Sequence, residues 1–226
     1  MKFRCAIVAG IVNIALMGCG GVSDRGSENV LSKGSKYAVR DNSFAYRQLK
    51  IEDFKAEALD RGPGNVVHHV QARSCISIQT AADTRIRSKA TEKQGKAYVG
   101  TLSNVRYQAI FEPYCSWWNT GVAENRVEYI LEHEQIHFAL TELSARKLNE
   151  RVQQSFNAKT IYGSTVQEVE DKLRDKVRLA SKKAIAMSSN DHSDFDNQTS
   201  FVYEPEKQQN WLEHVTRRLA ETEQYR

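Results

Sequence analysis

The sequence predicts an α+β fold, in which a short, mostly antiparallel sheet precedes and packs against one long helix, with two further C-terminal helices completing the domain. In short stretches of the first half of the chain, apolar residues occur at every second position, which is typical of strands. From about residue 124 onwards they recur every three or four positions, which is typical of helices.

The composition is that of a folded globular chain. Of 226 residues, 40% are hydrophobic and only 3 are Pro and 12 Gly, which excludes collagen-like, low-complexity and wholly disordered classes. The formal net charge of +4 arises from 32 basic and 28 acidic residues scattered along the chain without a run of one sign. No nucleic-acid partner is therefore expected.

The N-terminus has the pattern of an export signal. Lys2 and Arg4 precede an apolar run over residues 5–17, which is too short for a membrane span and suits the hydrophobic region of a signal peptide. The run ends in Leu16-Met17-Gly18-Cys19, which resembles a bacterial lipobox. We expect residues 1–18 to be a lipoprotein signal peptide; a plain secretory signal is the alternative.

Cys19 is then the lipidated residue that anchors the protein to a membrane. Residues 19–36 are rich in Gly and Ser and lack periodicity, so we expect a flexible tether, followed by a single domain over residues 37–226. Gly20 after the cysteine resembles the sorting pattern for the outer membrane. The expected location is the cell envelope, on the outer membrane facing the periplasm.

Two cysteines remain in the expected mature domain. Cys75 and Cys115 would lie in a compartment that permits disulfides, and a bond between them would close a loop of about 40 residues. Such a bond stabilises a fold by about 2–4 kcal/mol, mainly through the unfolded state. Two buried free thiols are the alternative.

The spacing of apolar residues and the capping signals predict the order of strands and helices. We expect short strands at residues 75–80, 97–99 and 105–111, and either one long helix or two abutting ones over residues 124–156. Ser164 with Gln167 resembles a capping box and predicts the start of a second helix, while Pro205 predicts the start of a third. Between these two helices, residues 188–200 are expected to form a polar loop.

The motif that carries chemistry is His133-Glu134-Gln135-Ile136-His137, an H-E-x-x-H pattern in the middle of the predicted long helix. Four residues turn by about 400°, so both imidazoles project from one face of the helix. Neutral imidazoles at this spacing bind Zn²⁺ and leave room for a third ligand and a water. Glu134, at the edge of that face, is then the general base.

The third zinc ligand is open on spacing alone. Leu140 and Thr141, the next residues on the same face, are poor ligands, and Glu142 points away from the two histidines in a continuous helix. His192 in the expected polar loop is the better candidate. The carboxylate alternatives in that loop are Asp191, Asp194 and Asp196.

The remaining histidines and one tyrosine have two kinds of expected role. His68 and His69 are expected to be structural or surface residues. Tyr203 and His214 are candidates for stabilising the transition state, although nothing in the sequence fixes either near the zinc.

Four patches together resemble a family of bacterial secreted or lipid-anchored predicted zinc-dependent proteases, the domain of unknown function 922. They are the L-x-W-x-D-F-like residues 49–54, the F-x-P-x-x-S-W-like residues 111–117, the helix from His133 to Leu148, and Asp191-His192, similar to a D-H-G, followed by Gln209 and Trp211, similar to a Q-x-x-W. The resemblance implies a zincin-like protease and favours His192 as third ligand. This chain departs from the family pattern at Ile51, Ile136, Ala139 and Ser193.

The predicted function is therefore a zinc-dependent peptidase that acts on a peptide or protein substrate in the cell envelope. An extended substrate would be held by strand addition to the sheet edge beside the cleft. One alternative is a non-catalytic envelope lipoprotein, with a binding or assembly role and a structural or vestigial metal. Another is a zinc hydrolase acting on a non-peptide amide, since the motif specifies an activated water and not the bond.

Overall fold

The computed structural model describes residues 42–59, 70–91, 95–155, 160–200 and 203–226. Within these residues the chain is α+β, with three α-helices and small sheets whose strand pairs are all antiparallel, as expected. The signal peptide, the tether with Cys19, and the pair His68 and His69 lie outside the described residues. Across the described part of the chain, no helix has the length and apolarity that crossing a membrane requires.

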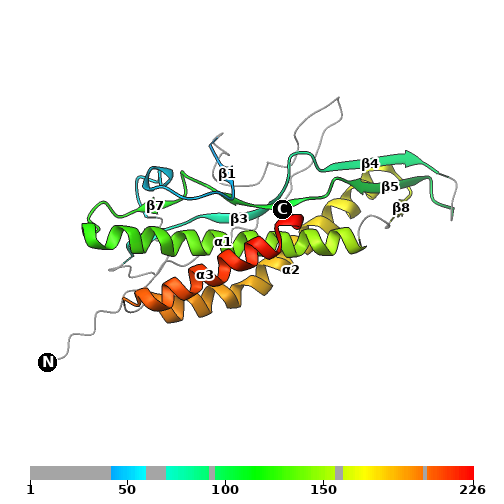
Figure 1. Cartoon of the computed structure of the whole chain (residues 1–226). Helices are drawn as coiled ribbons and strands as arrows, with labels where there is room; N and C mark the ends of the chain where they lie inside the picture. Colours follow the sequence, from blue (N-terminus) through cyan, green and yellow to red (C-terminus); the bar gives the residue numbers. More distant parts are fainter. Residues whose placement is uncertain (1–41, 60–69, 92–94, 156–159, 201–202) are drawn as a thin grey trace.

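The expected single sheet is divided into three small ones, which Figure 1 shows above the helices. Their strand orders are β1-β6-β3, β2-β7 and β4-β5-β8, and in the first sheet Ile76 of β3 pairs with Phe111 of β6. The strands are β1 (Phe44–Ala45), β2 (Ala72–Arg73), β3 (Ile76–Thr80), β4 (Arg85–Ala90), β5 (Tyr98–Ser103), β6 (Tyr107–Phe111), β7 (Trp117–Trp118) and β8 (Ile161–Gly163).

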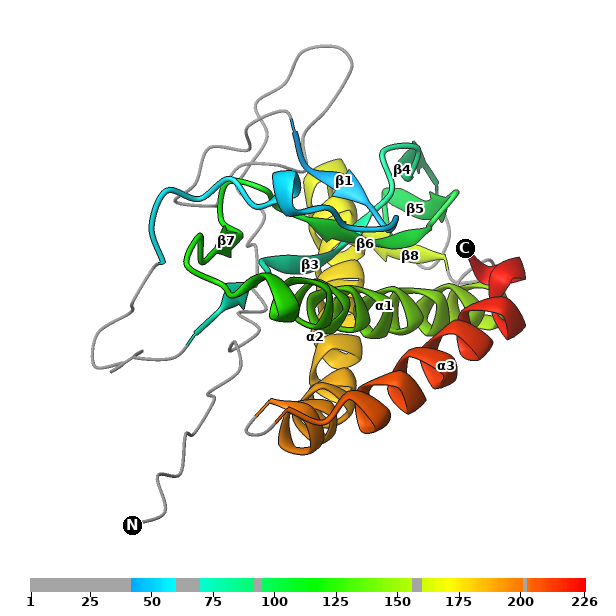
Figure 2. The ribbon, with the colours of Figure 1, turned by 60° about the vertical axis from the view of Figure 1, so that its left-hand side comes forward.

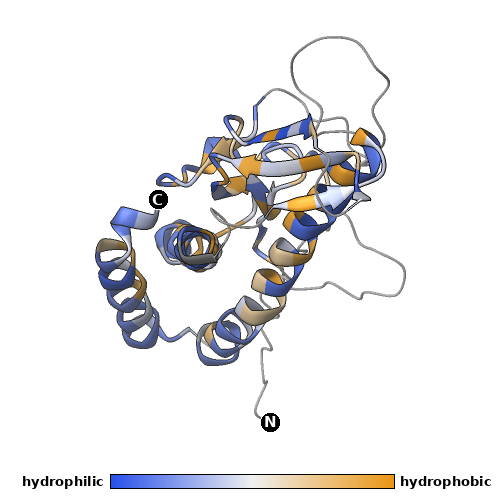
Figure 3. Ribbon diagram, turned by 90° about the vertical axis from the view of Figure 1, so that its right-hand side faces the viewer, coloured by the Kyte–Doolittle hydropathy of each residue, from blue (hydrophilic) through white to orange (hydrophobic). Residues whose placement is uncertain are grey.

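The long helix α1 (Glu124–Ser155) is continuous over 32 residues and lies at the centre of the molecule. Viewed along its length, α1 has the strands on one side and the other two helices around the rest (Figure 3). Phe138 packs with Phe111 and Ile76 of the first sheet. On its other side, α1 packs against α2 and α3 through a second apolar cluster. Because α1 is buried on both sides, the side chains of the H-E-x-x-H motif are interior groups.

Helix α2 (Val166–Thr199) crosses α1, so that its C-terminal end lies beside the first half of α1 (Figures 1 and 2). Its N-terminal end packs on the third sheet, where Gly100 allows a close approach because a Cβ at this position would overlap Val169 and Leu173. The N-cap is Thr165, whose hydroxyl accepts the Glu168 amide, so the predicted capping pair Ser164 and Gln167 is wrong by one residue.

The predicted loop over residues 188–200 is wrong: α2 continues to Thr199. The reason is burial, because Phe195 is fully enclosed in the cluster that joins α1, α2 and α3. The hydroxyls of Ser188 and Ser189 donate to carbonyls three residues earlier instead of ending the helix. The polar stretch thus forms the last turns of a long helix, and its side chains have fixed directions.

Helix α3 (Pro205–Glu221) begins with Pro205 in its first turn, as predicted, and returns along α1. A short 3-10 turn, Glu223–Tyr225, follows it at the C-terminus. Val215 of α3 is buried against Phe195, so α3 closes the side of the α1–α2 pair that the strands leave open.

A disulfide joins Cys75 and Cys115, whose Cα atoms lie 5.6 Å apart. It connects the residue before β3 to the turn between β6 and β7. The hydroxyl of the neighbouring Ser116 accepts the Cys75 amide and donates to the Glu112 carbonyl. This corner of the first sheet is thus fixed covalently and by hydrogen bonds.

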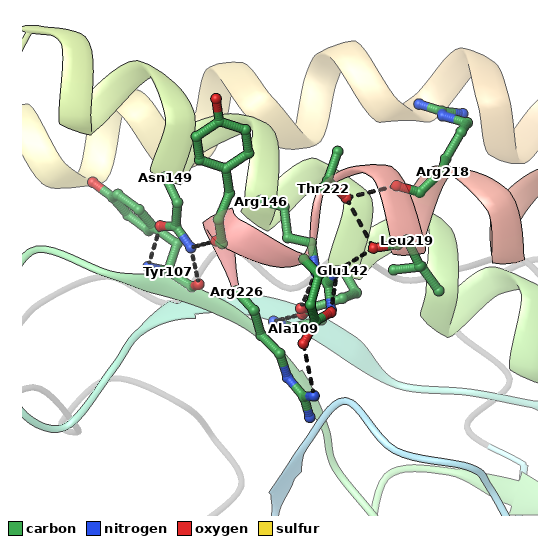
Figure 4. A network of polar contacts seen from close by, with 11 residues as sticks. Tyr107, Ala109, Glu142, Arg146, Asn149, Arg218, Leu219, Thr222 and Arg226 are labelled. Carbon is green, nitrogen blue, oxygen red and sulfur yellow. Dashed lines mark hydrogen bonds and ion pairs between the residues drawn. The ribbon is translucent and has the colours of Figure 1, made fainter.

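A buried polar network fixes the second half of α1 to the C-terminus (Figure 4). Arg146 donates to the Glu142 carboxylate at 2.9 Å and to the Leu219 carbonyl at 2.6 Å. Asn149 bonds both the amide and the carbonyl of Tyr107 on β6 and also donates to the Tyr225 carbonyl. The network sets the position of α1 relative to the sheet and to α3.

Candidate metal centre

The two motif histidines face α2 from one side of α1. They lie one helical turn apart, and their Nε2 atoms are 3.1 Å from each other. His133 is 6% exposed and His137 only 1%. Phe195 of α2 packs against both rings, with centroids at 4.4 Å from His133 and 5.0 Å from His137. The paired imidazoles are therefore buried between the two helices.

Asp196 of α2 completes a group of three ligand atoms. Its Oδ1 lies 3.0 Å from Nε2 of His137 and 3.3 Å from Nε2 of His133. Zinc with bonds of about 2.0–2.1 Å in a tetrahedral site separates its ligand atoms by about 3.3 Å. A triangle with edges of 3.0, 3.1 and 3.3 Å is therefore the size that one such ion requires. The residues present thus fit a two-histidine, one-carboxylate zinc site.

The Asp196 carboxylate is held in its charged form. Burial raises its pKa, but hydrogen bonds from His133 and His137 outweigh burial and hold the pKa well below its usual range. The Ser200 hydroxyl also donates to Oδ1, at 3.1 Å. A charged carboxylate beside two imidazole nitrogens is the electrostatic arrangement that a divalent cation needs.

His192, the predicted third ligand, lies behind His137 and not beside the three ligand atoms. Its Nδ1 is 2.8 Å from Nδ1 of His137, and the planes of the two rings are only 15° apart. Burial, and then the nearby His137, lower the pKa of His192 to about 3, so its ring is neutral. The structure thus brings His192 to the site on the far side of a ligand ring.

The other candidate carboxylate ligands do not join the group. Glu142 is buried in its pair with Arg146 and accepts the Ala109 amide at 3.2 Å. Asp191 lies 3.4 Å from Arg218, and Asp194 is exposed. Among the described residues, the group of metal-ligand geometry consists of His133, His137 and Asp196.

Glu134, the predicted general base, follows His133 directly and is 3% exposed. Its carboxylate makes no hydrogen bond or ion pair with any described residue, and it is not one of the three grouped ligands. The residue that follows a candidate ligand in α1 is thus a buried carboxylate that is not itself one of the grouped ligands.

The two candidate stabilisers of a transition state have other contacts. Tyr203 packs on Tyr129 with ring centroids 4.8 Å apart, and the Arg126 guanidinium lies over the Tyr203 ring at 3.8 Å. His214 packs against Trp211 and lies near two arginines of α3. Neither residue contacts the three grouped ligand atoms in the described structure.

Sequence reasoning missed two groups of the site, Thr199 and Ser200, whose hydroxyls each lie 3.5 Å from a nitrogen of His133. A detectable signal was present: His192, Asp196 and Thr199 have helical spacing in a stretch without Gly or Pro.

In comparisons with known proteins, no family model, no curated protein and no solved structure matches this chain.

Proposed function

We propose that the protein is a zinc-dependent peptidase of the bacterial cell envelope, with Glu134 as general base and His133, His137 and Asp196 as zinc ligands. The single observation that carries the proposal is the triangle of Nε2, Nε2 and Oδ1 atoms with edges of 3.0 to 3.3 Å. Asp196 takes the place first assigned to His192. The H-E-x-x-H sequence within α1 supports the same chemistry.

Zinc at such a site lowers the pKa of water to about 7 and polarises a carbonyl group. Glu134 accepts a proton from the water that attacks the peptide carbonyl, and later gives it to the leaving amine. Asp196 supplies the negative charge among the ligands, and Phe195 excludes bulk water from the imidazole pair. These roles require a peptide or protein substrate to reach the site from outside.

The zincin-like character and the cell-envelope location are part of the same proposal. A long H-E-x-x-H helix packed against antiparallel strands is compatible with a zincin-like domain. The lipobox-like residues before Cys19 support a lipid anchor, and the disulfide between Cys75 and Cys115 supports an oxidising compartment outside the cytosol. The resemblance to the domain of unknown function 922 points the same way.

A structural metal is the second candidate function, and one observation favours it. Both histidines are nearly inaccessible, and the buried Ser200 hydroxyl lies within 3.5 Å of Nε2 of His133, next to the ligand atoms. Structural zinc sites are closed, whereas catalytic sites keep a position for water or substrate. In this reading the metal joins the end of α2 to α1 and the protein binds or assembles other envelope components.

One experiment separates the candidates. The chain without residues 1–19 is purified without a metal-binding tag, and both its zinc content and its hydrolysis of labelled casein are measured for wild type, Glu134→Gln and the exposed control Glu128→Gln. A peptidase retains about one zinc per chain in all three forms and loses at least about 100-fold of its activity only in Glu134→Gln. Zinc without hydrolysis in wild type favours the structural role, and no zinc after supplementation refutes both.

A further inference from the structure

The last turns of α2, together with its C-cap residue Ser200, meet the imidazole pair of α1 at four positions. His192, Asp196, Thr199 and Ser200 follow one another at helical spacing, and each has a side-chain atom within 3.5 Å of a nitrogen of His133 or His137. All are buried except Asp196, which is partly exposed. The second half of the candidate site is therefore a contiguous strip of one helix.

His192 approaches His137 from the side opposite the metal triangle. A contact of 2.8 Å between two imidazole nitrogens requires that one of them carries a proton and the other accepts it. His137 presents Nε2 to Asp196 and His133, and a nitrogen that binds a metal has to be unprotonated. With a metal in place of the hydrogen bond from His137 to Asp196, the proton between the rings is then on Nδ1 of His137, and Nδ1 of His192 is the acceptor.

Thr199 makes the equivalent contact with His133. Its hydroxyl donates its only proton to the Phe195 carbonyl at 2.7 Å. The oxygen that faces Nδ1 of His133 at 3.5 Å can therefore only accept. This longer contact favours the tautomer in which Nδ1 of His133 carries the proton and Nε2 is free for a metal.

We propose that His192 and Thr199 are positioning residues of the metal centre, which hold His137 and His133 in the tautomer that leaves both Nε2 atoms unprotonated. The proposal rests on the proposed zinc site, and it assigns His192 a role other than ligand. Nδ1 of His192 accepts from Nδ1 of His137, on the side of the His137 ring opposite the metal. This atom therefore does not lie on the metal side of that ring. Partners of this kind commonly change metal affinity by about 10–100-fold without being ligands.

The test pairs each disruptive variant with a conservative one. His192→Leu removes the acceptor, whereas His192→Asn keeps an acceptor oxygen near the position of Nδ1; Thr199→Val removes the hydroxyl, and Thr199→Ser keeps it. Zinc affinity is measured by competition with a chromophoric chelator. We expect His192→Leu to weaken binding by about 10–100-fold and Thr199→Val by about 10-fold, with one zinc still bound per chain. The Asn and Ser variants are expected to restore most of the affinity.

The tautomers provide a readout that does not depend on any variant folding. In zinc-loaded wild-type protein, long-range ¹H–¹⁵N NMR spectra are expected to show protonated Nδ1 and metal-bound Nε2 for both His133 and His137. Zinc on Nδ1 of either histidine overturns the proposal, as does unchanged affinity in His192→Leu. Loss of zinc stoichiometry in both His192→Leu and His192→Asn makes His192 a ligand. If wild type binds no zinc, the metal centre itself is refuted.

Discussion

Asp196 on α2 places a carboxylate oxygen 3.0 Å from Nε2 of His137 on α1, across 59 residues of sequence. The contact is partly buried and joins two helices that also share the apolar cluster around Phe195. A metal bound here therefore has ligands from both helices, so its binding energy also stabilises their packing.

Asp196→Ala is expected to abolish stoichiometric zinc binding, because it removes one of three ligand atoms and the only carboxylate of the group. The matched control is Asp194→Ala, which removes an exposed carboxylate two residues away on the same helix. Zinc per chain, measured by elemental mass spectrometry, distinguishes them. Full zinc content in Asp196→Ala would show that the third ligand is elsewhere.

Removal of zinc is expected to lower the melting temperature. A ligand at 100 times its Kd stabilises the native state by about 2.7 kcal/mol, and each kcal/mol shifts Tm by about 2–4 °C in a chain of this size. Treatment with a chelator should therefore lower Tm by about 5–10 °C, and zinc should restore it, as measured by scanning calorimetry. In Asp196→Ala the chelator should have no effect; an equal shift there would indicate binding at another site.

The site was partly predictable because its first half is local. The H-E-x-x-H residues lie in a stretch without Gly or Pro, so helical spacing alone places both histidines on one face of α1. The ligand from α2 was not predictable in the same way. Ser, Asn and Asp favour caps and turns, so residues 188–200 have the composition of a loop, and only the burial of Phe195 extends the helix through them.

In a loop, His192 and Asp196 have no defined relative direction, whereas in a helix they lie one turn apart on one face. Which of the two reaches the Nε2 side of His137 then depends on how α2 crosses α1, which a single sequence does not contain. Several strands were likewise not predictable from the sequence. β4 has the mostly polar sequence of an exposed edge, and β1, β2 and β7 have two residues each, too few for any periodicity.

The disulfide is expected to stabilise the first sheet. The double variant Cys75→Ser, Cys115→Ser should lower the free energy of unfolding by about 2–4 kcal/mol, because the bond closes a loop with a sequence separation of 40 residues. Urea denaturation of the oxidised protein and of the variant measures the difference. Zinc content should not change, since this corner contributes no residue to the metal group. A stability equal to that of wild type would contradict the expected contribution.

Arg146→Met tests whether Glu142 is a structural group and not a ligand. The substitution leaves the Glu142 carboxylate buried without the guanidinium that now lies 2.9 Å away, and breaking a buried pair in this way costs about 3–5 kcal/mol. Zinc content should stay near one per chain, because neither residue belongs to the metal group. Replacing both residues, as Glu142→Leu with Arg146→Met, should cost less than Arg146→Met alone, since no charge is then left buried.

The control for this prediction is Lys147→Met, which removes an exposed charge one residue along α1 and should change stability by less than about 0.5 kcal/mol. Urea denaturation gives the free energy of unfolding of each of the three variants relative to wild type. Elemental analysis gives the zinc content of the folded variants. A folded Glu142→Leu, Arg146→Met protein without zinc would contradict the structural role, because loss of metal without loss of fold is the result expected of a ligand. A cost in Arg146→Met no larger than in Lys147→Met would show that the pair contributes nothing to holding α1 in place.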